Sequence, residues 1–264
     1  MMMKSLWCAV IWMGFVAGAQ AQIAQAPDFA AKVNDPDGMA TRTLACTTCH
    51  GAQGKATQNG YFPRIAGKPA GYLYNQLLNL RDGRRHYPTM GYLLENLTDD
   101  YLREMAVHFA SLDIPYPEPL VAKEPPSVLE RGRKLVFEGD ASRSLPACVQ
   151  CHGTAMTGVA PFVPGLLGLP RDYLNGQLGA WKSGKRHAQE PDCMAAVAKQ
   201  LSPEDVGAVS AWLSAQPVPN GGKPADGFAV RMPVTCGGVD DVASAHFRSG
   251  SGSGSSSNAG ATTK

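Results

Sequence analysis

Hydrophobic residues recur at helical spacing in two stretches that together span residues 69–112. In the first stretch, Leu73, Leu77 and Leu80 fall on one face of a helix. Pro69 suits the first turn of that helix, and Gly83 suits its end. The spacing predicts a helix from about Pro69 to Leu80 with its apolar face buried.

The second stretch, residues 97–112, has a helix start signal followed by an apolar stripe. Thr98 is a good N-cap residue, and the carboxylates of Asp99 and Asp100 favour the positive end of the helix dipole. The predicted buried stripe consists of Leu102, Met105 and Phe109.

The same arrangement recurs about a hundred residues later, which indicates a tandem duplication. "GYLYNQL" in the first copy corresponds to "DYLNGQL" in the second, and "RDGRRH" corresponds to "KSGKRH". Ser202-Pro203-Glu204-Asp205 begins the last helix of the second copy. Three pairs match at an offset of 101: Tyr72 with Tyr173, Gln76 with Gln177, and Arg85 with Arg186. Alternating strand patterns are absent, so we predict an all-α protein of two tandem helical domains.

These patterns divide the chain into five segments. The expected segments are a signal peptide (1–21), a first domain (22–112), a proline-rich linker (113–127), a second domain (128–217) and a C-terminal extension with a Gly/Ser-rich disordered tail (218–264).

The N-terminus has the layout of a secretory signal. Lys4 precedes an apolar run from Leu6 to Ala17, and small residues continue through Ala21. Cleavage is expected after Ala19 or Ala21, since the run is shorter than the roughly 20 residues that span a bilayer. A retained membrane anchor is the alternative. We expect a periplasmic protein that is at most peripheral to a membrane.

Composition narrows the function classes. Hydrophobic residues make up 44% of the chain, charged residues 17%, and the formal net charge is only +2. A nucleic-acid partner is not expected, because such proteins need a dense basic face.

Each copy contains one Cys-x-x-Cys-His unit: Cys46, Cys49 and His50 in the first, and Cys148, Cys151 and His152 in the second. A zinc site, a redox pair or a disulfide explains the cysteines but not the adjoining histidine. Covalent haem explains all three residues, because two thiols form thioethers and the histidine becomes the proximal iron ligand. We therefore predict two haem c groups, which also fill the core of two small helical domains.

The sixth ligand of each iron is predicted to be a methionine. Met90 and Met194 occupy matching positions, 40 and 42 residues after the motif histidines, in what we expect to be loops before the last helix. His86 and His187 also match across the copies, so histidine ligation stays open.

Two further features surround these candidates. Cys193, next to Met194, either forms a disulfide with Cys236, which an exported protein favours, or competes for the second iron. Pro63 and Pro164 also match, and each carbonyl is a candidate acceptor for the proximal histidine's Nδ1–H, although a loop-shaping role is equally compatible.

Residues 40–216 resemble the dihaem cytochromes of the c4 type. The resemblance lies in the two Cys-x-x-Cys-His units, each followed by a "P-x-x-x-G" loop, a "Y-L-x-x-Q-L" helix, a "G-x-R" turn, a methionine and an "L-[ST]-x-[DE]" helix. It implies two class I cytochrome c domains related by a pseudo-twofold axis. It also implies ligation by His50 with Met90 and by His152 with Met194, and the carbonyl role of Pro63 and Pro164. Cys193 and the extension past residue 217 depart from the pattern.

The resemblance implies a periplasmic electron carrier rather than an enzyme. Its expected partners are a dehydrogenase or quinol-oxidising complex as donor and a terminal oxidase as acceptor. The alternatives are a haem enzyme, either a dihaem peroxidase or a sulfur-compound dehydrogenase, and a cytochrome subunit of a dehydrogenase complex.

Overall fold

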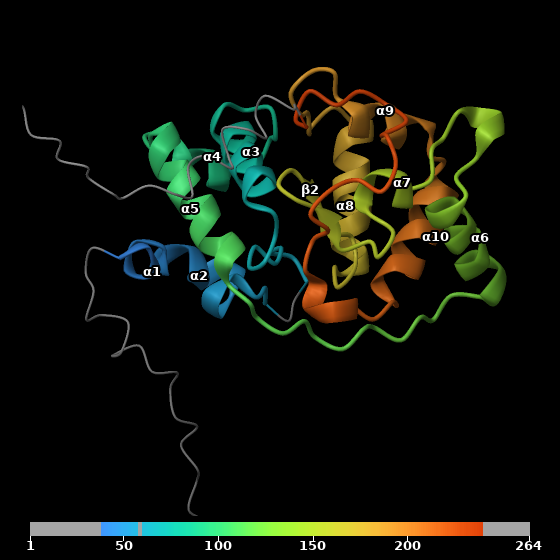
Figure 1. The fold of residues 1–264 in the computed structure, drawn as a ribbon, viewed down its shortest axis with the longest axis horizontal. Coiled ribbons are helices and arrows are strands. Elements are labelled where there is room, and N and C mark those ends of the chain that lie inside the picture. Colours follow the sequence, from blue (N-terminus) through green and yellow to red (C-terminus); the bar gives the residue numbers. More distant parts are fainter. Residues whose placement is uncertain (1–37, 58–59, 240–264) are drawn as a thin grey trace, which may run out of the picture.

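The computed structural model describes residues 38–57 and 60–239. Two helical halves lie side by side, with the first half on the left of Figure 1 and the second on the right. The predicted all-α architecture of two tandem domains is confirmed. The predicted signal peptide, residues 1–21, and the Gly/Ser-rich tail lie outside the described residues. Within the described residues, every helix is too short or too polar to cross a membrane.

The first half consists of short helices joined by turns. Its elements are α1 (Met39–Arg42), α2 (Leu44–His50), the 3₁₀ turn η2 (Ala52–Gly54), α3 (Ala70–Arg81), α4 (Pro88–Leu94) and α5 (Asp99–Ser111). The predicted cap is present, because Thr98 Oγ1 accepts the Tyr101 N–H at 3.3 Å. Leu102, Met105 and Phe109 are all buried, as the apolar stripe predicts.

The second half has its helices in a corresponding order, but it begins with a longer helix and contains a pair of short strands. Its elements are α6 (Pro126–Phe137), η3 (Ala141–Arg143), α7 (Val149–His152), β1 (Gly158–Val159), β2 (Val163–Pro164), α8 (Arg171–Lys182), α9 (Cys193–Gln200), α10 (Pro203–Ser214) and η4 (Pro219–Gly222). The helix α6 begins inside the predicted linker 113–127, because Pro126 occupies its first turn, where a missing N–H costs nothing.

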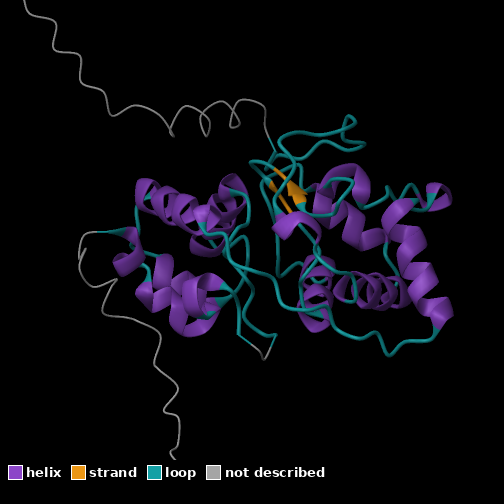
Figure 2. Cartoon of the chain, turned by 60° about the horizontal axis from the view of Figure 1, so that its bottom comes forward, coloured by secondary structure: helices purple, strands orange, loops and turns teal. Residues whose placement is uncertain are grey.

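The two strands are a feature that the sequence did not predict. They form an antiparallel pair in which Gly158 faces Pro164 and Val159 faces Val163 (Figure 2). Two residues per strand are too few to produce a readable alternation of polar and apolar positions.

Helix packing follows the duplication. The helix α3 packs on α5 and α8 packs on α10, while α1 packs on α5 as α6 packs on α10. Gly132 permits the close approach of α6, since a Cβ there would lie 2.2 Å from the Ala208 carbonyl oxygen of α10. The short α1 thus has a structural counterpart in the second half.

A buried carboxylate joins the start of α10 to its surroundings. The Asp205 side chain is fully buried and pairs with Arg131 at 2.6 Å and Arg143 at 2.7 Å. It also accepts the Ser202 backbone N–H at 3.0 Å, which completes a capping box. Burial opposes ionisation, but the hydrogen bonds from Arg143, Ser202 and Arg131 hold the pKa of Asp205 below its usual value.

Replacing Asp205 by Asn is expected to lower the free energy of unfolding by about 2–4 kcal/mol, because two cations lose their shared anion. Since the folded pKa lies below the usual value of about 3.9, this stabilisation is present above that pH and is lost as the pH falls further. Urea unfolding at neutral and acidic pH measures both effects. The exposed pair of Glu130 with Arg133 supplies the control, and Glu130→Gln should leave the unfolding midpoint unchanged. An unchanged midpoint in Asp205→Asn would contradict the argument.

Candidate functional site

Each half encloses a cavity that collects the residues singled out from the sequence. The first cavity, of about 550 Å³, is lined by Cys46, Cys49, His50, Pro63 and Met90. The second, of about 210 Å³, is lined by the matching set of Cys148, Cys151, His152, Pro164 and Met194. Each cavity is therefore lined by one Cys-x-x-Cys-His unit and by one of the two candidate methionines.

The first histidine is held in one orientation by the backbone. His50 ends α2 and is buried, and its Nδ1 lies 2.8 Å from the Pro63 carbonyl oxygen. Burial lowers the pKa of His50, so its imidazole is neutral near pH 7. A neutral imidazole that donates through Nδ1 presents the lone pair of Nε2 to the cavity.

The turn after this histidine requires glycine. Gly51 has φ +75°, and a Cβ at this position would lie 2.2 Å from the Ala56 carbonyl oxygen. The Ala56 N–H in turn donates to the His50 carbonyl at 2.7 Å. This closed turn directs the chain from the motif toward the Pro63 loop.

The second half repeats the geometry. His152 is buried, and its Nδ1 lies 2.8 Å from the Pro164 carbonyl oxygen. Burial lowers the pKa of His152 and raises the pKa of the Cys148 thiol to about 12. Both cysteines of this unit have free thiols, as do Cys46 and Cys49.

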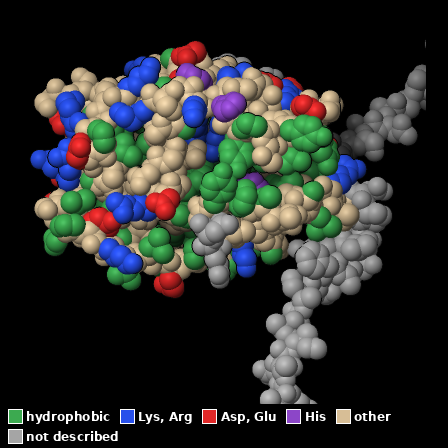
Figure 3. Space-filling model, turned by 180° about the vertical axis from the view of Figure 1, so that it is seen from behind, with side chains coloured by type: hydrophobic (Ala, Val, Ile, Leu, Met, Phe, Trp, Pro, Cys, Tyr) green, Lys and Arg blue, Asp and Glu red, His purple; other side chains and the backbone are tan. Residues whose placement is uncertain are grey.

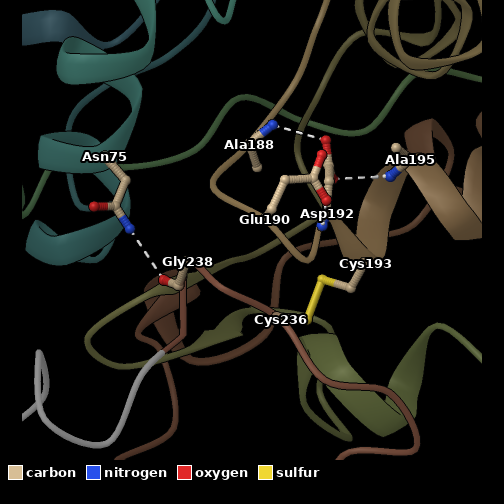
Figure 4. Close-up of a disulfide and its surroundings, with 8 residues drawn as sticks. All are labelled: Asn75, Ala188, Glu190, Asp192, Cys193, Ala195, Cys236 and Gly238. Atoms are coloured by element: carbon tan, nitrogen blue, oxygen red, sulfur yellow. Dashed lines mark hydrogen bonds between the residues drawn. A yellow bond between two sulfur atoms is a disulfide. The ribbon is translucent and has the colours of Figure 1, made fainter.

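The methionines lie on short helices, which corrects the prediction that they lie in loops. Met90 is in α4 and Met194 is in α9. Proline in the first turn starts α4, and Asp192 caps α9 by accepting the Ala195 N–H at 3.0 Å. A second oxygen of Asp192 accepts the Ala188 N–H at 2.7 Å (Figure 4), so the loop before Met194 is fixed on both sides.

The other ligand candidates are placed differently. The side chains of His86 and His187 are exposed, and of these two only His86 lines a cavity. Cys193 forms the predicted disulfide with Cys236, so its sulfur is not available as a thiolate ligand. Among the described residues, no group of three or more His, Cys, Asp or Glu side chains is arranged to hold a metal ion, the cluster that a shared zinc site needs.

The repeat-matched polar residues meet between the two halves. Arg85 donates to Gln177 at 2.8 Å, and Arg186 donates to Gln76 at 2.9 Å, so each arginine reaches the opposite half. The backbones also pair here, with the His86 N–H donating to the Lys185 carbonyl and the His187 N–H to the Arg84 carbonyl. Six residues line both cavities: Lys68, Tyr72, Gln76, Tyr173, Gln177 and Arg186.

Lys68 is a member of this cluster that sequence reasoning missed. It is buried, and at the matching position the second copy has Leu169. The signal in the sequence was a cation between two residues that do match across the copies, Gly67 and Pro69. Within the described residues, no carboxylate forms an ion pair with Lys68, Arg85 or Arg186. Lys68 and Arg186 are buried and Arg85 is half-buried. Buried cations without anions are costly, so the cluster suits a bound group that carries carboxylates.

The residues present therefore fit haem c. Each cavity offers two thiols, an oriented neutral imidazole and a methionine, and the region between the cavities offers cations suited to the propionates of haem. The described residues thus include candidates for attaching the haem, for binding its iron and for balancing the charge of its propionates.

Comparison with known proteins gives consistent relatives. The sequence model of the family described as cytochrome c matches residues 129–216. A thiosulfate dehydrogenase electron acceptor from Stutzerimonas stutzeri is 34% identical over 72% of this chain and 87% of its own length. A cytochrome c4 from Pseudomonas aeruginosa is 31% identical over 65% of this chain and 84% of its own. The crystal structure of cytochrome c4 from Pseudomonas stutzeri superposes with a TM-score of 0.58 at 27% identity, covering 67% of this chain and 96% of that one.

Proposed function

The chain belongs to the dihaem c-type cytochromes, a family of electron-transfer proteins, and from this premise we propose that it accepts electrons from a periplasmic thiosulfate dehydrogenase. The single observation that supports a carrier role is the pair of cavities, each of which is lined by one Cys-x-x-Cys-His unit and one methionine.

Two haem c groups are the cofactors of this family. When bound, each supplies an iron that gains or loses one electron without a change of ligands. Cys46 and Cys49 would hold the first haem and His50 and Met90 its iron. In the second half Cys148 and Cys151 would hold the haem, with His152 and Met194 on the iron. The carbonyls of Pro63 and Pro164 keep each imidazole oriented, because the Nδ1–H of a ligating histidine needs an acceptor.

The cluster between the halves supports electron exchange within the chain. Lys68, Arg85 and Arg186 place positive charge between the cavities, where it would compensate the propionates. The crossed bonds of Arg85 to Gln177 and of Arg186 to Gln76 hold the halves in a fixed relation. Electron transfer between two sites that are held in a fixed relation is favoured, because no docking step has to precede the transfer.

The donor is proposed from the relatives. Two proteins named thiosulfate dehydrogenase electron acceptors, from Stutzerimonas stutzeri and Thiomonas intermedia, are 34% and 33% identical to this chain. Export by the N-terminal segment would place this chain in the periplasm. The cytochrome c4 relatives favour a broader role between a quinol-oxidising complex and an oxidase, which is the second candidate.

Stopped-flow reduction tests the donor. The oxidised holoprotein is mixed with a thiosulfate dehydrogenase and thiosulfate, and we expect both haems to become reduced at a rate that depends on the enzyme concentration. A sample without thiosulfate is the control. Reduction by a quinol-oxidising complex alone, with none by the dehydrogenase, would reject the proposed donor and favour the second candidate.

A further inference from the structure

The C-terminal extension crosses the second half after α10 and η4 (Figure 1). Two of its attachments lie on either side of residues 226–235. Ala225 pairs with β1, donating to the Gly158 carbonyl at 2.9 Å and accepting the Ala160 N–H at 2.8 Å. Eleven residues later Cys236 is bonded to Cys193, the residue that precedes Met194. We refer to residues 223–239 as the strap.

The strap has one inward and one outward face near its second attachment. Arg231, Pro233 and Thr235 are exposed. The intervening residues Met232, Val234 and Cys236 are half-buried or buried, and all three line the second cavity. This alternation is the pattern of an extended segment that covers an apolar surface.

The disulfide is the principal restraint on this covering segment. No backbone hydrogen bond joins residues 226–235 to another described residue. Beyond Cys236, the Gly237 N–H donates to the Pro191 carbonyl at 3.0 Å, and Asn75 of α3 donates to the Gly238 carbonyl at 3.0 Å (Figure 4). The end of the strap therefore also reaches the first half.

The first cavity has no such cover among the described residues. After α5 the chain leaves directly through residues 113–125 toward the second half (Figure 1). The side chains lining the first cavity include Tyr61, which is 62% exposed, and Leu93, which is 58% exposed. Hydrophobic side chains gather on the face over the first half, on the right of Figure 3. By contrast, Gln189 and Pro191 are the only exposed residues among the described lining of the second cavity.

We propose that the disulfide-tied strap closes the second cavity to solvent, so that external ligands and redox partners reach this chain through the open edge of the first cavity. The inference rests on the proposed function in one respect, which is that both cavities hold haem. The strap then makes the two halves unequal: the first exchanges with the outside, and the second exchanges chiefly with the first.

Cyanide binding to the oxidised holoprotein tests the closure. Cyanide replaces a weak axial ligand on ferric haem, so its binding rate depends on how readily that ligand leaves and on how readily cyanide reaches the iron. Strap variants that leave both proposed ligands in place report the second factor. We expect a fast phase from the first half and a slow phase from the second. Replacing Cys193 and Cys236 together by serine should speed the slow phase at least tenfold and leave the fast phase unchanged. Met90→Ala, which removes the proposed ligand of the first half, assigns the fast phase.

Two further variants make the test decisive. A chain that ends after Val239 keeps the strap and should retain both rates. Met232→Ser combined with Val234→Ser keeps the disulfide but weakens the apolar cover, and it should also speed the slow phase. This variant tests the closure even if the Cys193→Ser, Cys236→Ser variant does not fold. A slow phase that stays unchanged in both strap variants, with two haems present by mass, would overturn the closure. A protein that lacks haem would instead overturn the proposed function.

Discussion

Replacing Met194 by alanine is expected to remove half of the methionine-to-iron charge-transfer absorption of the oxidised protein. Met194 and His152 line the same cavity, and Met194 lies in the first turn of α9, which the Asp192 side chain caps. Thioether ligation favours the reduced iron, and axial ligands span a range of roughly 0.8 V in haem potential. The potential of the second haem should therefore fall sharply while that of the first stays near its original value.

Met90→Ala is the matched variant in the first half, since Met90 occupies the corresponding place on α4. It should remove the other half of the absorption, and the double variant should remove all of it. A Met156→Ala variant is the control, because Met156 is a buried core residue that lines neither cavity. Retention of the full absorption in Met194→Ala would exclude Met194 as a ligand and return His187 to consideration.

Local signals made the long helices predictable. Thr98 and Ser202 cap α5 and α10 as expected, and the leucine spacing located α3 within one residue at each end. The short helices were missed for a physical reason. The helices α4 and α9 have seven and eight residues, so neither contains enough turns to establish a periodicity.

Part of the candidate site could likewise be predicted from the sequence, and part could not. The motif residues and their matched methionines could be found from the sequence because spacing along the chain determines them. The cluster between the halves could not, because Arg85 bonds Gln177 across 92 residues and the sequence gives only the match of each residue with its own counterpart. The position of the strap over the second cavity could likewise not be predicted from the sequence. The pairing of Cys193 with Cys236 could be predicted, but the inward direction of Met232 and Val234 depends on the path of the strap.

The second large effect is expected when Cys148 and Cys151 are both replaced by alanine. The mass of the purified protein should then show one haem in place of two, because the thioether attachment of the second haem is lost. Buried core residues of this half, including Leu174, Leu201 and Leu213, line the second cavity. Without the haem these side chains would face an empty space, which costs both transfer free energy and packing.

The loss should therefore extend beyond the cofactor to the fold of the second half. Circular dichroism should show reduced helix content, and proteolysis should cut within residues 128–217 while the first half keeps its haem and its Met90 absorption. The serine variant of Cys193 and Cys236 is the control for cysteine removal in the same half, and it should retain two haems because neither residue belongs to a Cys-x-x-Cys-His unit. A double-alanine variant that still carries two covalent haems would show that these thiols do not form the attachment. One that loses the haem but keeps its full helix content would show that the leucine core is sufficient without it.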